Sequence, residues 1–515
     1  MAPTQWLFFI LIVQVIHFIG TWKLYQRAGR KPWEAIIPIY NAIVLMQIIN
    51  RPKWWVILLF IPIINLLMFP VIWVETIRSF GFNHRKDTLL AIFTFGLYII
   101  YINYFTDEKY IENRSLIPRT ETGEWISSIV FAIVAATIIH TYLMQPYTIP
   151  TSSLEKSLLV GDFLFVSKFH YGARTPMTTI SMPMVHDTIP ILKIPSYLKK
   201  PSLPYFRIPG FQKIKRNDIV VFSWPADTVR YFGDHSGIHI QKPIDKKSNY
   251  VKRCVGIPGD SLEVKDGHVY INGVLSQMPD RTKIQFFYIV DTNGQQLSER
   301  TIRERYHVRE GTVKDGKYIL NLAEEDAEKM KSNLLVKNIT RYIEPKGSFD
   351  PKVFPHNQQY PWSVDNFGPI YIPQAGKTVA LTLETLPFYQ RIIEEYEHHQ
   401  LKIEGDKILI DGKAVTSYTF QQDYYWMMGD NRHNSEDARF WGYVPFDHVV
   451  GKPVFIWFSW DSEAKGILNK IRWDRLFTTV HGDGKAVSYF KYFIAVMLLC
   501  YGYSVYSDRK KRNKK

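Results

Sequence analysis

The chain has 515 residues, of which 46% are hydrophobic and 15% aromatic, so it is too apolar for a disordered protein and too long for one small domain. Its 63 basic and 48 acidic side chains give a net charge of +15, and its two cysteines cannot build a disulfide framework. Much of the basic excess lies beside apolar segments and not in a folded patch, which favours a membrane and argues against a nucleic-acid partner.

Five apolar stretches approach the roughly 20 residues that a helix needs to cross a bilayer. They are residues 6–22, 54–74, 88–105, 125–144 and 486–507. The first three predict a multi-span membrane domain at residues 1–123, and the fourth predicts the anchor of a second region, residues 124–485. The run at residues 35–49 contains Pro38 and is too short to cross, which favours an interfacial or re-entrant segment.

Basic residues predict which helix ends face the cytoplasm. They gather between the first two spans and after the last, at Lys23, Arg27, Arg30, Lys31, Arg51, Lys53, Arg509, Lys510, Lys511, Arg512, Lys514 and Lys515. Residues 145–485 are then expected outside the cytoplasmic membrane, and residues 486–515 are expected to form a last span with a basic cytoplasmic tail. Arg78, Arg85 and Lys86 disagree with this topology. The first span has no cleavage site after it and predicts an anchor, not a removable signal peptide.

Residues 145–485 alternate apolar and polar side chains in short runs separated by turn dipeptides, which predicts a mainly antiparallel β body. The expected strands are residues 218–222, 261–264, 268–271, 401–403 and 407–410, and the expected helices are residues 322–330 and 386–399. Residues 276–380 show no recognisable chemistry and are interpreted as an insertion that elaborates the body or forms a substrate-facing flap. The predicted fold is therefore a β body with about five transmembrane helices.

Three segments of the β body contain hydrolytic residue types in a fixed order. Residues 147–162 read YTIPTSSLEKSLLVGD, residues 250–260 read YVKRCVGIPGD, and residues 428–442 read MGDNRHNSEDARFWG. Together with the GDFLFVSKFHYG run at 161–172 and the DIVVF strand, they closely resemble the bacterial type I signal peptidases. That family consists of membrane-anchored serine proteases with a Ser/Lys dyad and coiled antiparallel sheets, so the resemblance implies this fold and this activity.

The physical logic of such a dyad depends on burial. A serine hydroxyl needs a base, and a lysine with its ordinary pKa of about 10.4 is the wrong base near neutrality. An apolar pocket disfavours the ammonium and lowers this pKa by about three units, worth roughly 4 kcal/mol. Lys252 lies in an apolar strand, and strand alternation puts Arg253 on the opposite face. Burial therefore predicts that Lys252 can act as a base.

The resemblance assigns roles to individual residues. Ser153 would attack the scissile carbonyl, Lys252 would take and return the proton, and Ser435 would hydrogen-bond Lys252. The backbone N–H of Ser153 and the hydroxyl of Thr151 would form the oxyanion hole. The remaining assignments are an Asp437–Arg439 supporting ion pair and a turn shaped by Asp430 and Asn431.

The resemblance also implies the substrate and its binding residues. The substrates would be exported precursors, bound as extended strands and cut after their N-terminal signal peptides at an A-x-A site of small residues. The matching substrate-binding positions are Tyr147, Ile149, Pro150, Leu154, Leu158, Tyr250 and Val251. The other partner is the lipid bilayer, and the role of residues 1–123 stays open between positioning near the secretion translocon and added anchorage. No metal and no organic cofactor is expected.

The nucleophile segment departs from the family's pattern. Ser152, Leu154, Lys156 and Ser157 stand where glycine, methionine, proline and threonine are usual. Leucine for methionine nearly conserves volume, so the adjoining pocket is expected to survive. Ser152 stays an alternative nucleophile, although the spacing back from Gly161 selects Ser153.

Other interpretations have weaker support. A Ser/His/Asp triad would use His433 near Asp430, or the Asp234-His235 pair, and a metal site would use Glu395 and His399, which lack an evident third ligand. A catalytically silent assembly or chaperone subunit is a rival function, and a protease dedicated to one partner is another.

Overall fold

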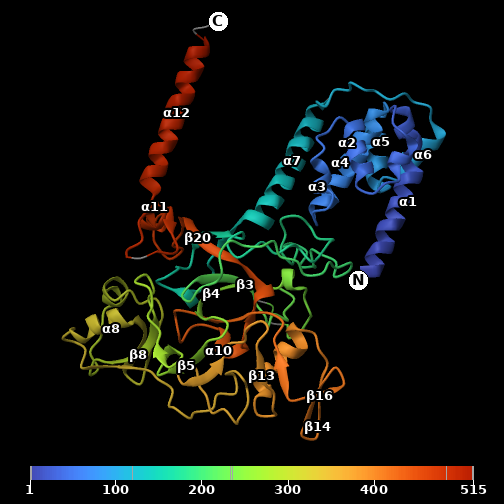
Figure 1. Ribbon diagram of the computed structural model, residues 1–515. Coiled ribbons are helices and arrows are strands. Elements are labelled where there is room, and N and C mark those ends of the chain that lie inside the picture. The colour runs from blue at the N-terminus through green and yellow to red at the C-terminus, as the bar shows by residue number, and fades with distance from the viewer. Residues whose placement is uncertain (1–2, 119, 232–233, 235, 483, 513–515) are drawn as a thin grey trace. The chain divides into compact units, whose positions relative to one another are not determined.

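The computed structural model describes residues 3–118, 120–231, 234, 236–482 and 484–512 (Figure 1). His235, Lys514 and Lys515, named above, lie outside the described residues. The chain divides into two compact units. We call Met1–Leu143, Arg174–Ile208 and Thr228–Lys247 the helical unit, and Met144–Ala173, Pro209–Asp227 and Ser248–Lys515 the β unit.

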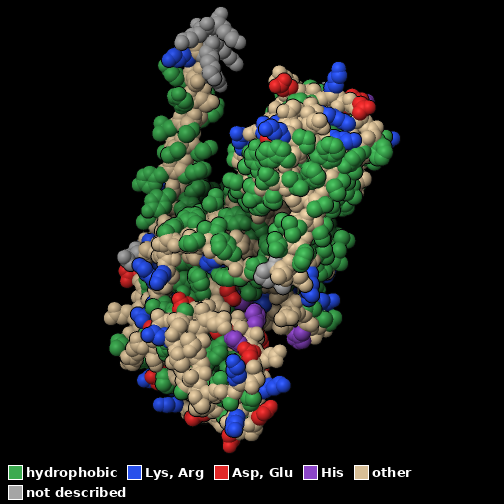
Figure 2. All heavy atoms as spheres, turned by 45° about the vertical axis from the view of Figure 1, so that its right-hand side comes forward, with side chains coloured by type: hydrophobic (Ala, Val, Ile, Leu, Met, Phe, Trp, Pro, Cys, Tyr) green, Lys and Arg blue, Asp and Glu red, His purple; other side chains and the backbone are tan. Residues whose placement is uncertain are grey.

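The helical unit contains seven α-helices in its described part. They are α1 (Pro3–Arg27), α2 (Tyr40–Ile48), α3 (Trp55–Leu58), α4 (Ile64–Ser79), α5 (Arg85–Phe93), α6 (Tyr98–Phe105) and α7 (Glu121–Ile138). Their buried core includes Tyr25, Met46 and Ile102. Apolar side chains remain on the outside of α1 and α7, such as Phe8 and Phe131, and Figure 2 shows such side chains covering much of the unit. A surface of this kind is suited to lipid and not to water.

Two helical segments of the described chain, Thr4–Arg27 and Glu121–Leu143, are long and apolar enough to cross a membrane. The pair α5 and α6 would make a third span if it counts as one, but it bends by 118°. The bend lies near Gly96, whose φ of 82° suits glycine. The predicted count of about five spans is therefore not confirmed.

The other predicted spans differ from continuous membrane helices in identifiable ways. Residues 54–74 are divided between α3 and α4, and Ile63 at the break has a φ of 70°. The last predicted span forms α12 (Phe490–Arg512), but it is not among the described helices that meet the length and apolarity required. Residues 35–49 contain the nine-residue helix α2, which is too short to cross, as predicted.

The β unit is built on an eight-stranded antiparallel sheet with the order β1-β2-β20-β3-β4-β18-β19, in which β21 also pairs with β20. Its strands are β1 (Met144–Thr148), β2 (Asp162–Ser167), β3 (Ile219–Ser223), β4 (Asn249–Gly256), β18 (Tyr424–Met428), β19 (Val444–Pro445), β20 (Val449–Ser459) and β21 (Thr478–Thr479). The predicted strand at residues 218–222 is confirmed by β3. Strands that are far apart in sequence, such as β4 and β18, are neighbours in this sheet.

The predicted hairpins form smaller sheets beside the large one. One sheet joins β12 (Phe367–Tyr371), β5 (Ser261–Lys265), β6 (His268–Ile271) and β7 (Val274–Leu275), and another joins β14 (Leu401–Glu404), β15 (Lys407–Ile410) and β16 (Lys413–Val415). A third pairs β13 (Thr378–Ala380) with β17 (Ser417–Thr419). They share a core around Trp426 and Phe354 with α9 (Leu386–Arg391). A π-helical segment (Ile392–Tyr396) continues α9, and together the two account for most of the helix predicted at residues 386–399. Two further short helices are α10 (Ala438–Trp441) and α11 (Ile467–Lys470).

Within residues 276–380, which the sequence predicted to elaborate the body or to form a substrate-facing flap, residues 276–341 form a folded subdomain, while β12 and β13 belong to the sheets described above. Its sheet has the order β11-β8-β10-β9 and comprises β8 (Gln285–Asp291), β9 (Gly311–Lys314), β10 (Lys317–Ala323) and β11 (Asn338–Arg341). Helix α8 (Glu324–Lys331) packs on it over a core that includes Phe286, Tyr306 and Met330. The helix predicted at residues 322–330 thus begins at Glu324, because Leu322 and Ala323 end β10. We call residues 276–341 the insertion subdomain.

Candidate active site

Ser153 and Lys252 meet in the β unit although 99 residues separate them in the chain. Ser153 lies in a short 3-10 turn (Ser152–Leu154) between β1 and β2, and Lys252 lies on β4 opposite Val220 of β3. Lys252 Nζ is 2.6 Å from Ser153 Oγ, which is hydrogen-bond distance. The two residues are only 4% and 6% exposed, so an amine and a hydroxyl are paired in a nearly dry site.

The surroundings of Lys252 disfavour its charged form. Burial lowers the pKa of Lys252 to about 8, although the negative charges of Asp437 and Glu436 act in the opposite direction. The Tyr250 ring lies 5.5 Å from the amine. The amine therefore titrates near neutral pH, where an exposed lysine stays fully protonated.

The segment that carries Ser153 packs on an apolar core cluster. Ile149, Leu154 and Leu158 are at most 3% exposed and belong to a core cluster with Ile219 and Ile456. The backbone closes the segment through Gly161 N–H to Ile149 O at 2.9 Å and Ile149 N–H to Asp162 O at 2.9 Å. This packing holds the turn that carries the hydroxyl.

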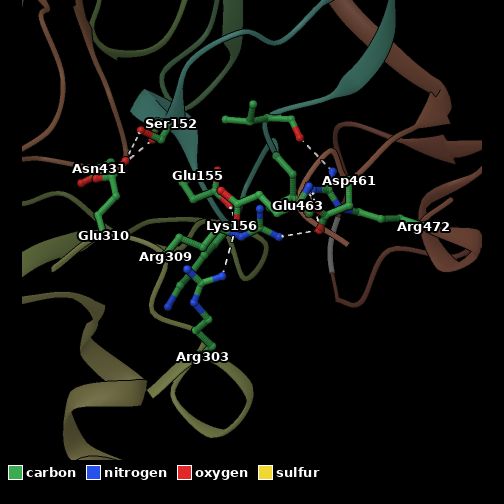
Figure 3. Close-up of polar contacts among 12 residues, drawn as sticks. Ser152, Glu155, Lys156, Arg303, Arg309, Glu310, Asn431, Asp461, Glu463 and Arg472 are labelled. Atoms are coloured by element: carbon green, nitrogen blue, oxygen red, sulfur yellow. Dashed lines mark hydrogen bonds and ion pairs between the residues drawn. The ribbon is translucent and has the colours of Figure 1, made fainter. Parts of the chain in front are cut away.

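The two adjacent serines have different partners. Ser152 Oγ donates to Glu310 Oε1 at 2.6 Å (Figure 3). It also accepts from Asn434 Nδ2 at 3.0 Å. Ser153, and not Ser152, contacts Lys252. The geometry therefore selects Ser153 as the hydroxyl that the amine can activate.

The loop after β18 forms hydrogen bonds with backbone carbonyls of the turn Ser152–Leu154, which we call the serine turn. Asn431 N–H donates to Ser153 O at 3.0 Å, and Asn431 Nδ2 donates to Ser152 O at 3.2 Å. Asp430 accepts two hydrogen bonds from Arg253 at 2.7 and 2.6 Å and one from Ser157 Oγ at 2.6 Å. Arg253 follows Lys252 on β4, so one strand binds the loop and also supplies the amine.

Asp437 and Arg439 form the predicted supporting ion pair. Arg439 Nη2 lies 2.8 Å from Asp437 Oδ2, and neither side chain is exposed. Burial alone raises the pKa of Asp437, but Arg439 and the Gly429 N–H outweigh it and hold the pKa below its usual range. The loop therefore keeps a negative charge close to the amine of Lys252.

The predicted hydrogen bond between Ser435 and Lys252 is absent from the described residues. Ser435 Oγ is buried and has no hydrogen-bond partner among them, since the amine of Lys252 is directed at Ser153 Oγ. Ser435 nevertheless lies next to the site, because a Cβ added to Gly429 would come within 2.2 Å of Ser435 Oγ and 2.6 Å of Ser153 O. Gly429 thus permits the close approach of the loop to the serine turn.

The remaining predicted residues divide by exposure. Thr151 is exposed and extended directly before the turn, and the first N–H groups of such a turn have no partner within it. Pro150 is exposed, and Tyr147, Tyr250 and Val251 are half-buried. Three residues predicted to bind substrate, Ile149, Leu154 and Leu158, are instead buried in the core. They can affect a subsite only by supporting the residues that line it.

The insertion subdomain also contacts the serine turn, and sequence reasoning missed this. Lys156 Nζ donates to Asp326 Oδ2 at 2.6 Å, and Gln285 Nε2 donates to Glu155 O at 2.6 Å. Arg309 Nε lies 3.4 Å from Glu155 Oε1 (Figure 3). The sequence signal that could have indicated these contacts was Lys156, which stands where the resembled family usually has proline.

The rival candidates are occupied elsewhere. His433 lies 2.9 Å from Asp365 Oδ1, and its Nδ1 accepts the Phe287 N–H at 3.0 Å, so it does not serve Ser153. Glu395 pairs with Arg391, while His399 pairs with Asp411. Across the described residues, no group of three or more His, Cys, Asp or Glu side chains has an arrangement that could hold a metal ion.

Comparison with known proteins agrees with this geometry. The family model described as "Signal peptidase, peptidase S26" matches residues 122–325 and 390–460, more than half of the chain. A family of unknown function, DUF5684, matches residues 33–113. Relatives named signal peptidase I match most of the chain, and three of them are described here. That of Buchnera aphidicola (subspecies Acyrthosiphon pisum) is 26% identical over 408 residues, which cover 76% of this chain and 95% of the relative. That of Haemophilus influenzae is 23% identical over 377 residues, 72% of this chain and 79% of the relative. That of Helicobacter pylori (strain 26695) is 25% identical over 384 residues, which cover 71% of this chain and 94% of the relative.

Proposed function

The chain belongs to the S26 family of signal peptidases, and from this premise we propose that it cleaves signal peptides from exported precursors by a Ser/Lys mechanism. As a member of this family it is a serine peptidase, a hydrolase of peptide bonds. The observation that carries the proposed mechanism is the 2.6 Å contact between the buried Lys252 amine and the Ser153 hydroxyl. A catalytically silent assembly or chaperone subunit would have no use for such a contact.

Catalysis proceeds in two proton-coupled steps. Neutral Lys252 takes the Ser153 proton as Oγ bonds to the scissile carbonyl carbon, and the ammonium then protonates the leaving amine as the peptide bond breaks. Lys252, neutral again, takes a proton from the water whose oxygen bonds to the acyl carbon, and it returns this proton to Ser153 Oγ as the ester bond breaks. The Ser153 N–H and the Thr151 hydroxyl stabilise the oxyanion, where one such donor is worth about 3 to 4 kcal/mol.

The position of Ser153 in the chain suits a membrane-bound substrate. The apolar segment Glu121–Leu143 continues into β1 at Met144, and the serine turn follows β1. The roughly ten residues between them span at most about 35 Å, so the nucleophile works close to the bilayer surface. The bilayer holds the apolar signal segment of a precursor at the same surface, and shared tethering raises the effective concentration. We assign the β unit to the outer side of the cytoplasmic membrane on the basic flanks of α1.

The edge of the large sheet supports binding of an extended peptide. In the described sheet order β1 is a terminal strand that pairs with β2. An edge strand offers unpaired N–H and C=O groups to which a substrate strand can add. Tyr147 on β1 and Tyr250 and Val251 on β4 then contribute side chains that leave room only for small residues.

Substrate specificity gives the direct test of the proposed function. The full-length protein in proteoliposomes is expected to cut a precursor with an A-x-A site once, directly after the second alanine, as mass spectrometry of the product would show. Replacing that alanine in the precursor with phenylalanine should lower the rate about 100-fold, because a bulky ring cannot enter a site built for a methyl group. Equal cleavage of both precursors, or cleavage of neither, would reject the proposal.

The pH dependence of cleavage should report the titration of Lys252. Below pH 8 kcat/KM should rise about tenfold per pH unit, and it should level off above about pH 8, because only the neutral amine is a base. Glu436→Gln removes a charge that favours the ammonium, so its midpoint should lie at lower pH with an unchanged plateau.

The matched control for this pH profile is Glu328→Gln, an exposed glutamate on α8 that should leave the midpoint in place. An unchanged or higher midpoint in Glu436→Gln would contradict the assigned role of Lys252.

A further inference from the structure

The insertion subdomain forms hydrogen bonds with three residues of the segment that carries Ser153, one in the serine turn and two directly after it. Ser152 donates to Glu310 at 2.6 Å, Lys156 donates to Asp326 at 2.6 Å, and the Glu155 carbonyl accepts from Gln285 at 2.6 Å. These partners come from different parts of the subdomain, since Gln285 begins β8 and Asp326 lies on α8. Figure 3 shows the Ser152 side chain beside Glu310 and the Glu155 side chain beside Arg309, which also belongs to the insertion subdomain.

The contact between Lys156 and Asp326 is the one of these three that joins two charged side chains. The two side chains are 14% and 3% exposed, and 170 residues separate them in the chain. Burial raises the pKa of Asp326, but Lys156 and Lys329 more than compensate and hold it below its usual value. Lys329 and His307 also face this carboxylate, at 3.2 and 3.6 Å. Asp326 therefore remains charged at the pH at which Lys252 is a base.

The backbone at Lys156 matches this contact. Lys156 has a φ of 68°, in the left-handed region that proline cannot adopt because its ring fixes φ near −65°. The proline usual for the resembled family would therefore not fit here. The contacts to the insertion subdomain coincide with two positions where the segment departs from the family's pattern, Ser152 and Lys156.

We infer that the insertion subdomain positions the nucleophile: Asp326, acting through Lys156, holds the serine turn so that Ser153 Oγ stays within reach of Lys252 Nζ. Asp326 and Lys156 are positioning residues, because neither contacts Ser153 Oγ or Lys252. The inference rests on the proposed function. Misplacement of a reacting atom by about 1 Å can lower a rate by about 100-fold. An ion pair three residues from the nucleophile can therefore have a large effect on kcat.

The test compares kcat and KM of the full-length protein in proteoliposomes, with the A-x-A precursor as substrate. Asp326→Asn should lower kcat at least tenfold and leave KM within twofold, because the substrate strand binds elsewhere. Glu328→Gln, which breaks an exposed ion pair on the same helix, should change kcat by less than twofold. Circular dichroism counts the folded fraction of each preparation, so that kcat refers to folded molecules.

A double-mutant cycle separates positioning from general stability. Lys156→Met should lower kcat as much as Asp326→Asn, and the double variant should be no worse than either single variant, because both remove one interaction. Lys156→Arg keeps the charge and should retain at least a third of the wild-type kcat. If Asp326→Asn does not fold, the comparison of Lys156→Met with Lys156→Arg tests the positioning role instead, because Lys156 is the more exposed residue of the pair.

The outcomes keep the two proposals apart. If the wild-type protein does not cleave the precursor, the proposed function fails. If it does and both Asp326→Asn and Lys156→Met keep the wild-type kcat per folded molecule, only the positioning role is overturned. Multiplicative losses in the double variant, or a rise in KM without a fall in kcat, would also overturn it.

Discussion

Replacing Ser153 with alanine is expected to stop precursor cleavage, with a loss in kcat of about a thousandfold or more. The Ser153 hydroxyl is the group within 2.6 Å of the buried Lys252 amine, and alanine leaves the base with nothing to activate. The variant should fold normally, because the apolar packing under the turn does not involve the hydroxyl. The measurement is single-turnover cleavage in proteoliposomes, followed by gel electrophoresis of precursor and product.

Ser152→Ala is the matched control, since it removes the neighbouring hydroxyl. Ser152 bonds to Glu310 and Asn434, so its loss should lower kcat less than tenfold. If Ser152→Ala were inactive and Ser153→Ala active, the nucleophile would be Ser152 and the arrangement around Lys252 would have another meaning.

Replacing Lys252 with methionine is expected to abolish cleavage and at the same time to stabilise the fold. Methionine has a similar shape but cannot take the proton from Ser153, so kcat should again fall about a thousandfold or more. The pKa of Lys252 falls from 10.5 to about 8 on folding, and one pH unit is worth about 1.4 kcal/mol. The wild-type ammonium thus destabilises the fold by about 3 kcal/mol at pH 7, and methionine removes this penalty.

The size of this effect depends on pH. The penalty is fully present below pH 8, where folded and unfolded chains are both protonated, and it disappears as the pH rises towards 10.5. Denaturant unfolding in detergent should therefore show a larger gain for Lys252→Met at pH 7 than at pH 9.5. Lys402→Met, at an exposed position on β14, should show no gain at either pH. A variant less stable than wild type at pH 7 would show that burial does not destabilise the Lys252 charge.

Much of the site could be predicted because its residues lie in short, ordered motifs. The motifs named Ser153 and Lys252, strand alternation separated Lys252 from Arg253, and the hairpins around Asp266 and Asp411 followed from local turn chemistry. The sequence predicted a Ser435–Lys252 hydrogen bond that the described residues do not make, because a motif does not show which acceptor lies nearest to the amine. The buried state of Leu154 and Leu158 depends on β20, which lies far along the chain.

The membrane topology and the insertion subdomain show where sequence reasoning ended. Hydropathy measures apolar length but not backbone direction, so the breaks at Ile63 and Gly96 were not visible in the pattern. The Lys156–Asp326 pair joins residues 170 positions apart, and neither residue lies in a pattern that names its partner. Long-range ion pairs of this kind become evident only when the fold brings the two segments together.

Because Lys252 and Arg253 are neighbours on β4, the proposed activity depends on the register of this strand. The amine reaches Ser153 while Asp430 binds the adjacent guanidinium. A slip of β4 by one residue against its neighbours would exchange the two faces and bring the guanidinium to the serine. A guanidinium keeps its proton at any physiological pH, so a chain assembled out of step would be inert. Under the proposed Ser/Lys mechanism, hydrolysis would therefore require β4 to pair with β3 in the register that places Lys252 opposite Val220.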